Sequence, residues 1–281
     1  MERVRRRNVV LLTRCSVAIS LLLVSMTAFA QDGGSPHVVR TTKFTIDNVD
    51  TNKAFYEGLV GMNEVDRFVS EGRLIEPFMA FDEGGRVGLL AYVEQEAVEK
   101  SPHPVSVFFV PDLDALVHRF EDAKYPMQVF SGEATNGVKV GIARDPSGNA
   151  IEFVEREGPP AVGGARLIVD DRKETEDFFV RVFGVKSGQR IETETFDEVF
   201  MDFGEGMFVA LFEPKHEVPL RKSQHPVVAI YSSEFDSVLE RVKAEGTAYR
   251  RGTVVREVGT GLFFVNDPSG NVVEVVRQRT P

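Results

Sequence analysis

The 281-residue chain contains no tryptophan and a single cysteine, Cys15. With one thiol, the chain cannot form an internal disulfide or a thiolate metal cluster. It also has no G-x-S-x-G motif, phosphate-binding loop or dinucleotide fingerprint, which disfavours hydrolase, NTPase and hydride-transfer functions. The formal net charge of −10 argues against nucleic acid and anionic membrane surfaces as partners.

The N-terminal segment has the pattern of an export signal. Residues 1–14 carry five arginines against one glutamate, residues 17–25 are apolar, and Ala28-Phe29-Ala30 fits an A-x-A cleavage site. The apolar run is too short for a membrane-spanning helix, which needs about 20 residues. We therefore expect residues 1–30 to be a signal peptide, removed on export to the periplasm or the exterior. A retained membrane anchor is the alternative. The mature chain would have no cysteine, and its net charge would be −14 because the segment carries +4.

One stretch of the sequence occurs twice, 122 positions apart. The two copies are Asp145-Pro146-Ser147-Gly148-Asn149-Ala150-Ile151-Glu152 and Asp267-Pro268-Ser269-Gly270-Asn271-Val272-Val273-Glu274. Asp-Pro-Ser-Gly is typical of a type I β-turn, and a strand is expected after it. On that strand Glu152 and Glu274 share a face with apolar neighbours. A carboxylate there is costly to bury unless it is paired, hydrogen-bonded or bound to a metal, so both glutamates are candidate site residues.

The rest of the chain follows the same repeat, as four units of about fifty residues. Each unit is expected to contain a strand, an amphipathic helix and three antiparallel strands joined by tight turns. The expected helices lie near residues 49–58, 113–120, 174–182 and 235–242. Units one and two would form a first half, residues 38–157, and units three and four a second half, residues 164–277. The Gly- and Pro-rich residues 158–164 are expected to link the two halves.

These features resemble the vicinal oxygen chelate superfamily, which contains the glyoxalase I, bleomycin-resistance and extradiol-dioxygenase folds. The resemblance rests on the paired β-α-β-β-β units, on Phe55-Tyr56 in the first helix, and on the Asp-Pro-Ser-Gly-Asn-x-Ile-Glu motif ending at Glu152. It implies an α+β fold of two tandem glyoxalase-like halves. In each half, two β-α-β-β-β units would form a curved cup with the helices outside.

The resemblance also allows a test for a metal site. In metal-dependent members, the cup holds a divalent metal such as Zn, Ni, Fe or Mn. Its ligands are histidines on the first strands of the units and carboxylates on the last strands. The corresponding first-strand positions in this chain are Thr41, Val105, Gly164 and Val227. None of these is a usual ligand for such metals.

Only the last-strand residues Glu152 and Glu274 match the metal-binding pattern. His103 and His225 lie two residues before the expected first-strand positions in units two and four. A strand would keep them on the same face, about 7 Å away. Each cup would then offer two protein ligands, whereas a catalytic metal usually has three.

Two classes of function remain open from the sequence. The first is an exported, metal-free protein that binds a small organic ligand in its cup, as drug-sequestering members of the family do. The second is a metal-dependent lyase, isomerase or dioxygenase in which Glu152 or Glu274 acts as ligand and base, helped by His103 or His225. A scaffold that acts through its surface is a weaker third reading. We expect the first, with no cofactor, and with a monomeric pseudo-dimer or a homodimer as the assembly. The sequence does not indicate which cup is active.

Overall fold

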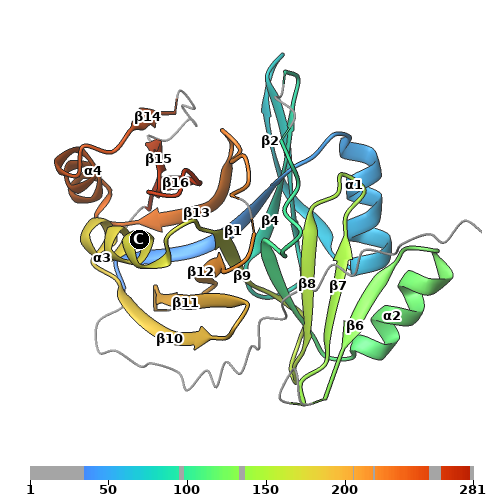
Figure 1. Cartoon of the computed structure of the whole chain (residues 1–281). Coiled ribbons are helices and arrows are strands. Elements are labelled where there is room, and N and C mark those ends of the chain that lie inside the picture. Colours follow the sequence, from blue (N-terminus) through green and yellow to red (C-terminus); the bar gives the residue numbers. More distant parts are fainter. Residues whose placement is uncertain are drawn as a thin grey trace, which may run out of the picture.

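The computed structural model describes residues 35–94, 98–132, 137–204, 206–217, 219–252 and 261–278. The expected signal peptide at residues 1–30, including Cys15, lies outside the described residues. Within those residues, no helix has both the length and the apolar character needed to cross a membrane. The chain forms two curved eight-stranded sheets, with α1 and α2 on one side of the molecule and α3 and α4 on the opposite side (Figure 1).

Units one and two follow the expected order of a strand, a helix and three antiparallel strands. The elements of unit one are β1 (His37–Thr45), α1 (Val49–Phe55), its π-helical continuation η1 (Tyr56–Val60), β2 (Asn63–Ser70), β3 (Leu74–Ala80) and β4 (Arg86–Tyr92). The elements of unit two are β5 (Ser106–Val110), α2 (Leu113–Asp122), β6 (Met127–Phe130), β7 (Val140–Arg144) and β8 (Ala150–Glu155).

Units three and four repeat this order. The elements of unit three are β9 (Ala161–Ile168), α3 (Arg172–Phe183), β10 (Lys186–Glu192), β11 (Phe196–Asp202) and β12 (Phe208–Pro214). The elements of unit four are β13 (Pro226–Ser232), α4 (Phe235–Ala244), β14 (Tyr249–Arg251), β15 (Leu262–Asn266) and β16 (Val272–Arg277).

The linker between the halves is shorter than the sequence indicated. We expected residues 158–164 to form it, but Ala161–Gly164 belong to β9 and pair with β5. The two glycines in this strand have a packing role rather than a loop role. A Cβ atom on Gly163 would lie 2.4 Å from the ring of Phe109, and one on Gly164 would lie 2.3 Å from the ring of Phe208. The linker prediction was therefore wrong for Ala161–Gly164.

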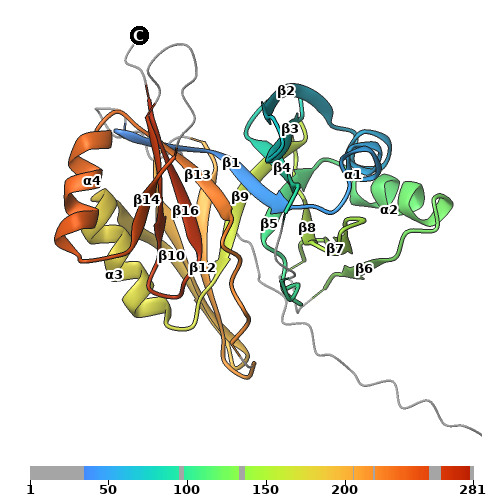
Figure 2. The ribbon, with the colours of Figure 1, turned by 90° about the horizontal axis from the view of Figure 1, so that it is seen from above.

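Each sheet combines one unit from each half. The strand orders are β14-β15-β16-β13-β1-β4-β3-β2 and β10-β11-β12-β9-β5-β8-β7-β6. Whereas we expected both units of a cup to come from the same half, unit one shares a sheet with unit four, and unit two with unit three. The central strands β1 and β9 run from one half into the other to make this connection (Figure 2). We call the concave side of the sheet of units one and four cup A, and that of units two and three cup B.

The convex faces of the sheets pack against the helices. In the first half, Phe120 of α2 packs on Phe153 of β8 with ring centroids 5.8 Å apart, and Tyr56 of η1 packs on Phe44 of β1 with ring centroids 6.4 Å apart. In the second half, α3 packs on β11 and β12 and also on α4. Each fully buried phenylalanine contributes about 1.5–3 kcal/mol of hydrophobic stabilisation.

The duplicated Asp-Pro-Ser-Gly turn has a structural role. As predicted, it is a β-turn, with the Gly148 N–H donating to the Asp145 carbonyl at 2.9 Å. The hydroxyl of Ser147 accepts a hydrogen bond of 2.9 Å from the N–H of Asp47 and another from the side-chain amide of Asn52. The turn of unit two therefore holds the start of the helix in unit one. The second copy of the turn holds the start of α3 in the same way, because the Asp170 N–H donates to the Ser269 hydroxyl at 2.9 Å.

Candidate ligand-binding site

A lysine lies between two carboxylates on the floor of cup A. Lys43 projects from β1, and its Nζ is 2.8 Å from Glu76 Oε1 on β3 and 2.5 Å from Glu274 Oε2 on β16. In the sheet, β3 and β16 are each two strands away from β1, on opposite sides. The ammonium group therefore joins unit one to unit four across the concave face.

All three groups of this cluster are buried, with exposed fractions of 6% for Lys43, 4% for Glu76 and 7% for Glu274. Burial disfavours the charge on Lys43, but the neighbouring carboxylates of Glu274 and Glu76 outweigh it, so the pKa of Lys43 is raised. Burial raises the pKa of Glu76, and the Lys43 ammonium only partly offsets this. Lys43 is thus held as a cation, which makes it unsuited to act as a nucleophile.

Cup B has the same arrangement with arginine in place of lysine. Arg166 on β9 donates from Nε to Glu198 Oε1 on β11 at 2.7 Å, and from Nη1 to Glu152 Oε2 on β8 at 3.2 Å. All three side chains are fully enclosed. Burial opposes the charge on Arg166, but the two carboxylates outweigh it and raise its pKa. Burial also raises the pKa of Glu152.

Neither cup fits the metal site of the family. At the first-strand positions of cup A, Thr41 accepts a hydrogen bond of 3.1 Å from Arg86 Nε, and Val227 is apolar. In cup B, the position of Gly164 lies under the Phe208 ring. Across the part of the chain that the structure describes, no three His, Cys, Asp or Glu side chains are arranged to hold a metal. Glu152 and Glu274, the two residues that match the pattern, each face a cationic side chain instead.

The two candidate histidines have other neighbours. His103 Nε2 lies 2.8 Å from Glu217 Oε1, and burial lowers the pKa of His103 against the opposing effect of that carboxylate. The imidazole of His225 stacks on Tyr92, with ring centroids 3.7 Å apart and planes inclined by 16°. Burial, and then the charge of Arg250, lower the pKa of His225. Both imidazoles therefore favour the neutral form.

Cup A contains a cavity of about 500 Å³ above the Lys43 cluster. This volume lies within the roughly 300–1,000 Å³ of small-molecule sites. Side chains from both halves of the chain line the cavity, many of them aromatic or charged. They include Arg40, Lys43, Phe68, Glu76, Phe78, Arg86, Tyr92, Tyr231, Phe264 and Glu274.

One wall of the cavity is cationic. Arg86, at the start of β4, donates from Nε to Thr41 Oγ1 at 3.1 Å and from Nη2 to the Tyr231 hydroxyl at 2.9 Å. Its guanidinium group lies 4.1 Å from the ring centroid of Phe78. Arg40 stands at a bulge of β1, between Val39 and Thr41 in the pairing with β13, and lies 5.7 Å from the Tyr231 ring centroid.

Cup B is filled by its own side chains at the corresponding positions. Phe208 stands 122 positions after Arg86, Phe109 stands 122 positions before Tyr231, and Gly163 stands 123 positions after Arg40. Phe109 and Phe208 are buried in one apolar cluster. The other members of that cluster are Val107, Val140, Val154, Phe200 and Ala210. Cup A is therefore the candidate binding site, and cup B has the packing of a core.

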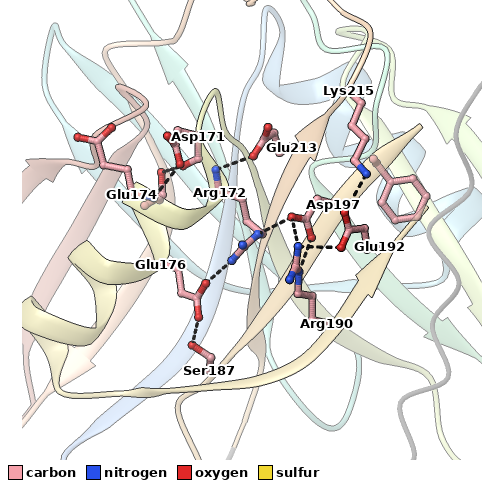
Figure 3. A network of polar contacts seen from close by, with 12 residues as sticks. Asp171, Arg172, Glu174, Glu176, Ser187, Arg190, Glu192, Asp197, Glu213 and Lys215 are labelled. Atoms are coloured by element: carbon pink, nitrogen blue, oxygen red, sulfur yellow. Dashed lines mark hydrogen bonds and ion pairs between the residues drawn. The ribbon is translucent and has the colours of Figure 1, made fainter. Parts of the chain in front are cut away.

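A second polar cluster lies on the convex side of β11 and has a structural explanation. Arg172 on α3 and Arg190 on β10 both donate to Asp197, at 2.7 and 2.8 Å (Figure 3). Successive strand residues face opposite sides, so Asp197 meets the helix whereas Glu198 faces cup B. The backbone N–H of Arg172 also donates to Glu213 at 2.8 Å, which fixes the start of α3. We assign no ligand to this cluster.

The sequence prediction found two of the six residues on the cup floors, Glu152 and Glu274. The repeat itself carries a signal for the other four. Lys43 and Arg166 are 123 positions apart, and Glu76 and Glu198 are 122 positions apart, which is the offset of the duplicated motif. Charged residues that recur at an offset of 122 or 123 positions would therefore have identified all four from the sequence.

The solved structures with a similar fold include glyoxalase I from Zea mays, in mutant and unmutated form. A point mutant of that protein superposes with a TM-score of 0.74 at 16% identity, covering 86% of this chain and 92% of that chain. Unmutated glyoxalase I from Zea mays superposes with a TM-score of 0.71 at 16% identity, covering 86% of this chain and 92% of that chain. A putative dioxygenase from Bacillus subtilis subsp. subtilis str. 168 superposes with a TM-score of 0.65 at 16% identity, covering 88% of this chain and 86% of that chain. At these identities, the likeness shows the fold alone.

The sequence comparison agrees with this fold. A search of curated proteins found no match. The sequence profile of the Glyoxalase/Bleomycin resistance protein/Dioxygenase superfamily matches residues 35–153 and again residues 161–275, which are the two halves of the fold. The chain therefore belongs to the Glyoxalase/Bleomycin resistance protein/Dioxygenase superfamily as a tandem duplication.

Proposed function

We propose that this protein binds a small organic molecule in cup A and does so without a catalytic metal. The observation that carries the proposal is the Lys43 ammonium held between Glu76 and Glu274 below a cavity of about 500 Å³. The two carboxylates already have a cationic partner, so a metal ion at Glu274 would have to displace Lys43. The cavity wall above them offers aromatic surface and guanidinium groups, which bind organic molecules.

The alternative is the metal-dependent lyase, isomerase or dioxygenase with Glu152 or Glu274 as ligand and base. That function needs a divalent metal, and the described residues of neither cup supply three suitable ligands. In that function the catalytic base would be either Glu274, which already forms an ion pair with Lys43, or Glu152, which lies on the floor of the filled cup B. The names of the structural neighbours, glyoxalase I and putative dioxygenase, favour this class only through the shared fold.

Metal analysis and thermal unfolding test the proposal together. We expect no stoichiometric Zn, Ni, Fe or Mn in the purified protein, and no change of Tm on addition of a chelator. A ligand of cup A should raise the Tm, because a molecule that binds only the folded state stabilises it. A metal that copurifies in a one-to-one ratio and is lost in Glu274→Ala would contradict the proposal.

We also propose that the protein acts after export, with residues 1–30 removed. The proposal rests on the basic, apolar and A-x-A segments in sequence order. Mass spectrometry of the protein recovered from its producing cells should find Gln31 as the first residue. Gel filtration of that form should give a monomer, since one chain already builds both cups. An intact N-terminus in a membrane fraction would support the retained anchor instead.

A further inference from the structure

We propose that the ligand of cup A is an organic carboxylate with a flat apolar body, and that Arg86 and Arg40 bind its carboxylate group. This inference rests on the proposed binding function and adds the chemical class of the ligand. Six charged side chains line the cavity: Arg40, Lys43, Glu76, Arg86, Glu274 and Arg277. Four of them are cationic and two are anionic, so the cavity carries an excess of positive charge although the whole chain is acidic.

Two of these cations are already neutralised by partners. Lys43 has both floor carboxylates, and Arg277 makes two hydrogen bonds to Asp236, at 2.7 and 2.6 Å. Arg86 and Arg40 differ from them. Arg86 makes a longer ion pair, from Nη1 to Oδ2 of the exposed Asp66 at 3.6 Å, and the described residues supply no ion pair to Arg40.

Arg86 is held in place for recognition of an anion. Hydrogen bonds to Thr41 and Tyr231 and stacking on Phe78 fix the plane of its guanidinium group. These contacts occupy one N–H on Nε and one on Nη2, which leaves further donors for a ligand. A planar guanidinium with two parallel N–H groups matches the two oxygens of a carboxylate. Because its side chain is already ordered, little conformational entropy is lost on binding.

The rest of the cavity fits an apolar, flat body. Phe68 on β2, Tyr92 on β4 and Phe264 on β15 contribute aromatic surface from both halves of the chain. The floor carries two carboxylates against one ammonium group, so it repels a second anion and directs the carboxylate toward the arginine wall. The ligand class therefore combines one anionic group with an aromatic or alicyclic portion.

Cup B supplies an internal comparison. It has the same floor of one cation and two carboxylates, but neither of the two arginines. Where cup A has Arg86, Tyr231 and Arg40, cup B has Phe208, Phe109 and Gly163, and its space is filled. The guanidinium groups thus belong to the cup that retains a cavity of ligand size, which links them to binding rather than to folding.

Three probes with one ring system and different charges test the inference. They are 2-naphthoate, the neutral 2-naphthamide and the cationic 2-naphthylmethylammonium, each titrated into the purified protein. Their fluorescence can be followed because the chain contains no tryptophan. We expect 2-naphthoate to bind at least about tenfold more tightly than the amide, the ratio given by one charge-assisted hydrogen bond, and to weaken as salt is added. The cationic probe should bind most weakly.

Single substitutions test which residues cause the preference for the carboxylate probe. Arg86→Gln and Arg40→Gln should each weaken 2-naphthoate about tenfold or more while changing 2-naphthamide less than about threefold. Arg86→Phe, which copies Phe208 of cup B, should abolish binding of all three probes. The control is Arg156→Gln, because Arg156 lies over the Phe109 ring in cup B and its counterpart in cup A is Gln278. It should leave every affinity unchanged.

The outcomes separate the two proposals. Equal binding of the acid and the amide, with both lost in Arg86→Phe, overturns the carboxylate inference and leaves the binding function standing. No binding of any probe, or binding that Arg86→Phe does not affect, overturns the binding function itself. The melting temperature of each variant shows whether it is folded, and Arg40→Gln provides the answer if Arg86→Gln fails to fold, since Arg40 is exposed.

Discussion

Replacing the central cation of each cup by methionine tests how the buried carboxylates are neutralised. Lys43→Met and Arg166→Met keep an unbranched side chain and remove the charge. Breaking a buried ion pair from one side costs about 3–5 kcal/mol, since a charge remains without its partner. Arg166 and both of its carboxylates are fully enclosed, so we expect Arg166→Met to lose about 4–5 kcal/mol.

Lys43→Met should cost less, about 2–3 kcal/mol, because the floor of cup A borders the cavity, from which water can solvate the two carboxylates left without Lys43. Part of this loss should disappear on acidification. Burial already raises the pKa of Glu76 while Lys43 opposes that shift, so removing Lys43 raises the pKa further. A group with a raised folded-state pKa contributes stability at low pH that is lost as pH rises through that pKa. The variant should therefore lie closer to the unmutated protein at pH 5 than at pH 8.

Urea unfolding at both pH values, always compared with the unmutated protein at the same pH, measures these differences. The double variant Lys43→Met/Glu76→Gln should recover about 1 kcal/mol or more at pH 8, because it removes one unpaired carboxylate. If Arg166→Met costs less than about 1 kcal/mol, the internal cation is not what makes the buried carboxylates tolerable. A Lys43→Met penalty that is the same at pH 5 and pH 8 would contradict the assigned role of Glu76.

Three further predictions concern the motif and the cup walls. Ser147→Ala and Ser269→Ala should each lower stability by about 1–2 kcal/mol in urea unfolding, because helix-start donors lose their acceptor. A loss below about 0.3 kcal/mol in both would exclude this role. Gly164→Ala should cost about 1–3 kcal/mol in the same assay, because its Cβ meets the Phe208 ring, and a neutral result would show that the ring can move away. Glu274→Gln should cost less than about 2 kcal/mol, since Lys43 keeps Glu76 as a partner, and a larger loss of Tm reversed by added metal would reveal a cation site.

Sequence reasoning identified the repeat and the element order because both depend on local patterns. The spacing of apolar residues placed all four helices, and turn chemistry placed the Asp-Pro-Ser-Gly turns. The pairing of units across the halves was not accessible in this way. Antiparallel hairpins within a unit are set by short turns, whereas β1 pairs with β13, from Thr42 with Val228 to His37 with Ser232, at separations of 186–195 positions that no local pattern encodes.

For a related reason, the sequence identified only one of the three floor residues in each cup. Glu152 and Glu274 were noticed because a recognisable turn precedes them. Lys43 and Glu76 lie in strands without a marker, and they become partners only when the sheet curves and brings β1, β3 and β16 together. The linker error had a different origin: glycines at residues 163 and 164 suggested a loop, but they make room for the rings of Phe109 and Phe208.

The duplication separates what the fold requires from what a ligand requires. Both cups keep a cation between two carboxylates, although a cavity of about 500 Å³ lies above it in cup A and packed apolar side chains occupy the corresponding positions of cup B. A feature common to an open cup and a filled cup cannot determine what the open cup binds, so its role is to join two units of one sheet. The residues that differ between the cups, Arg40 and Arg86 above all, are then the ones that set specificity. Substitutions on the floors should therefore change stability in both cups, while Arg40→Gln should change affinity and leave stability almost unaltered, because Arg40 is exposed.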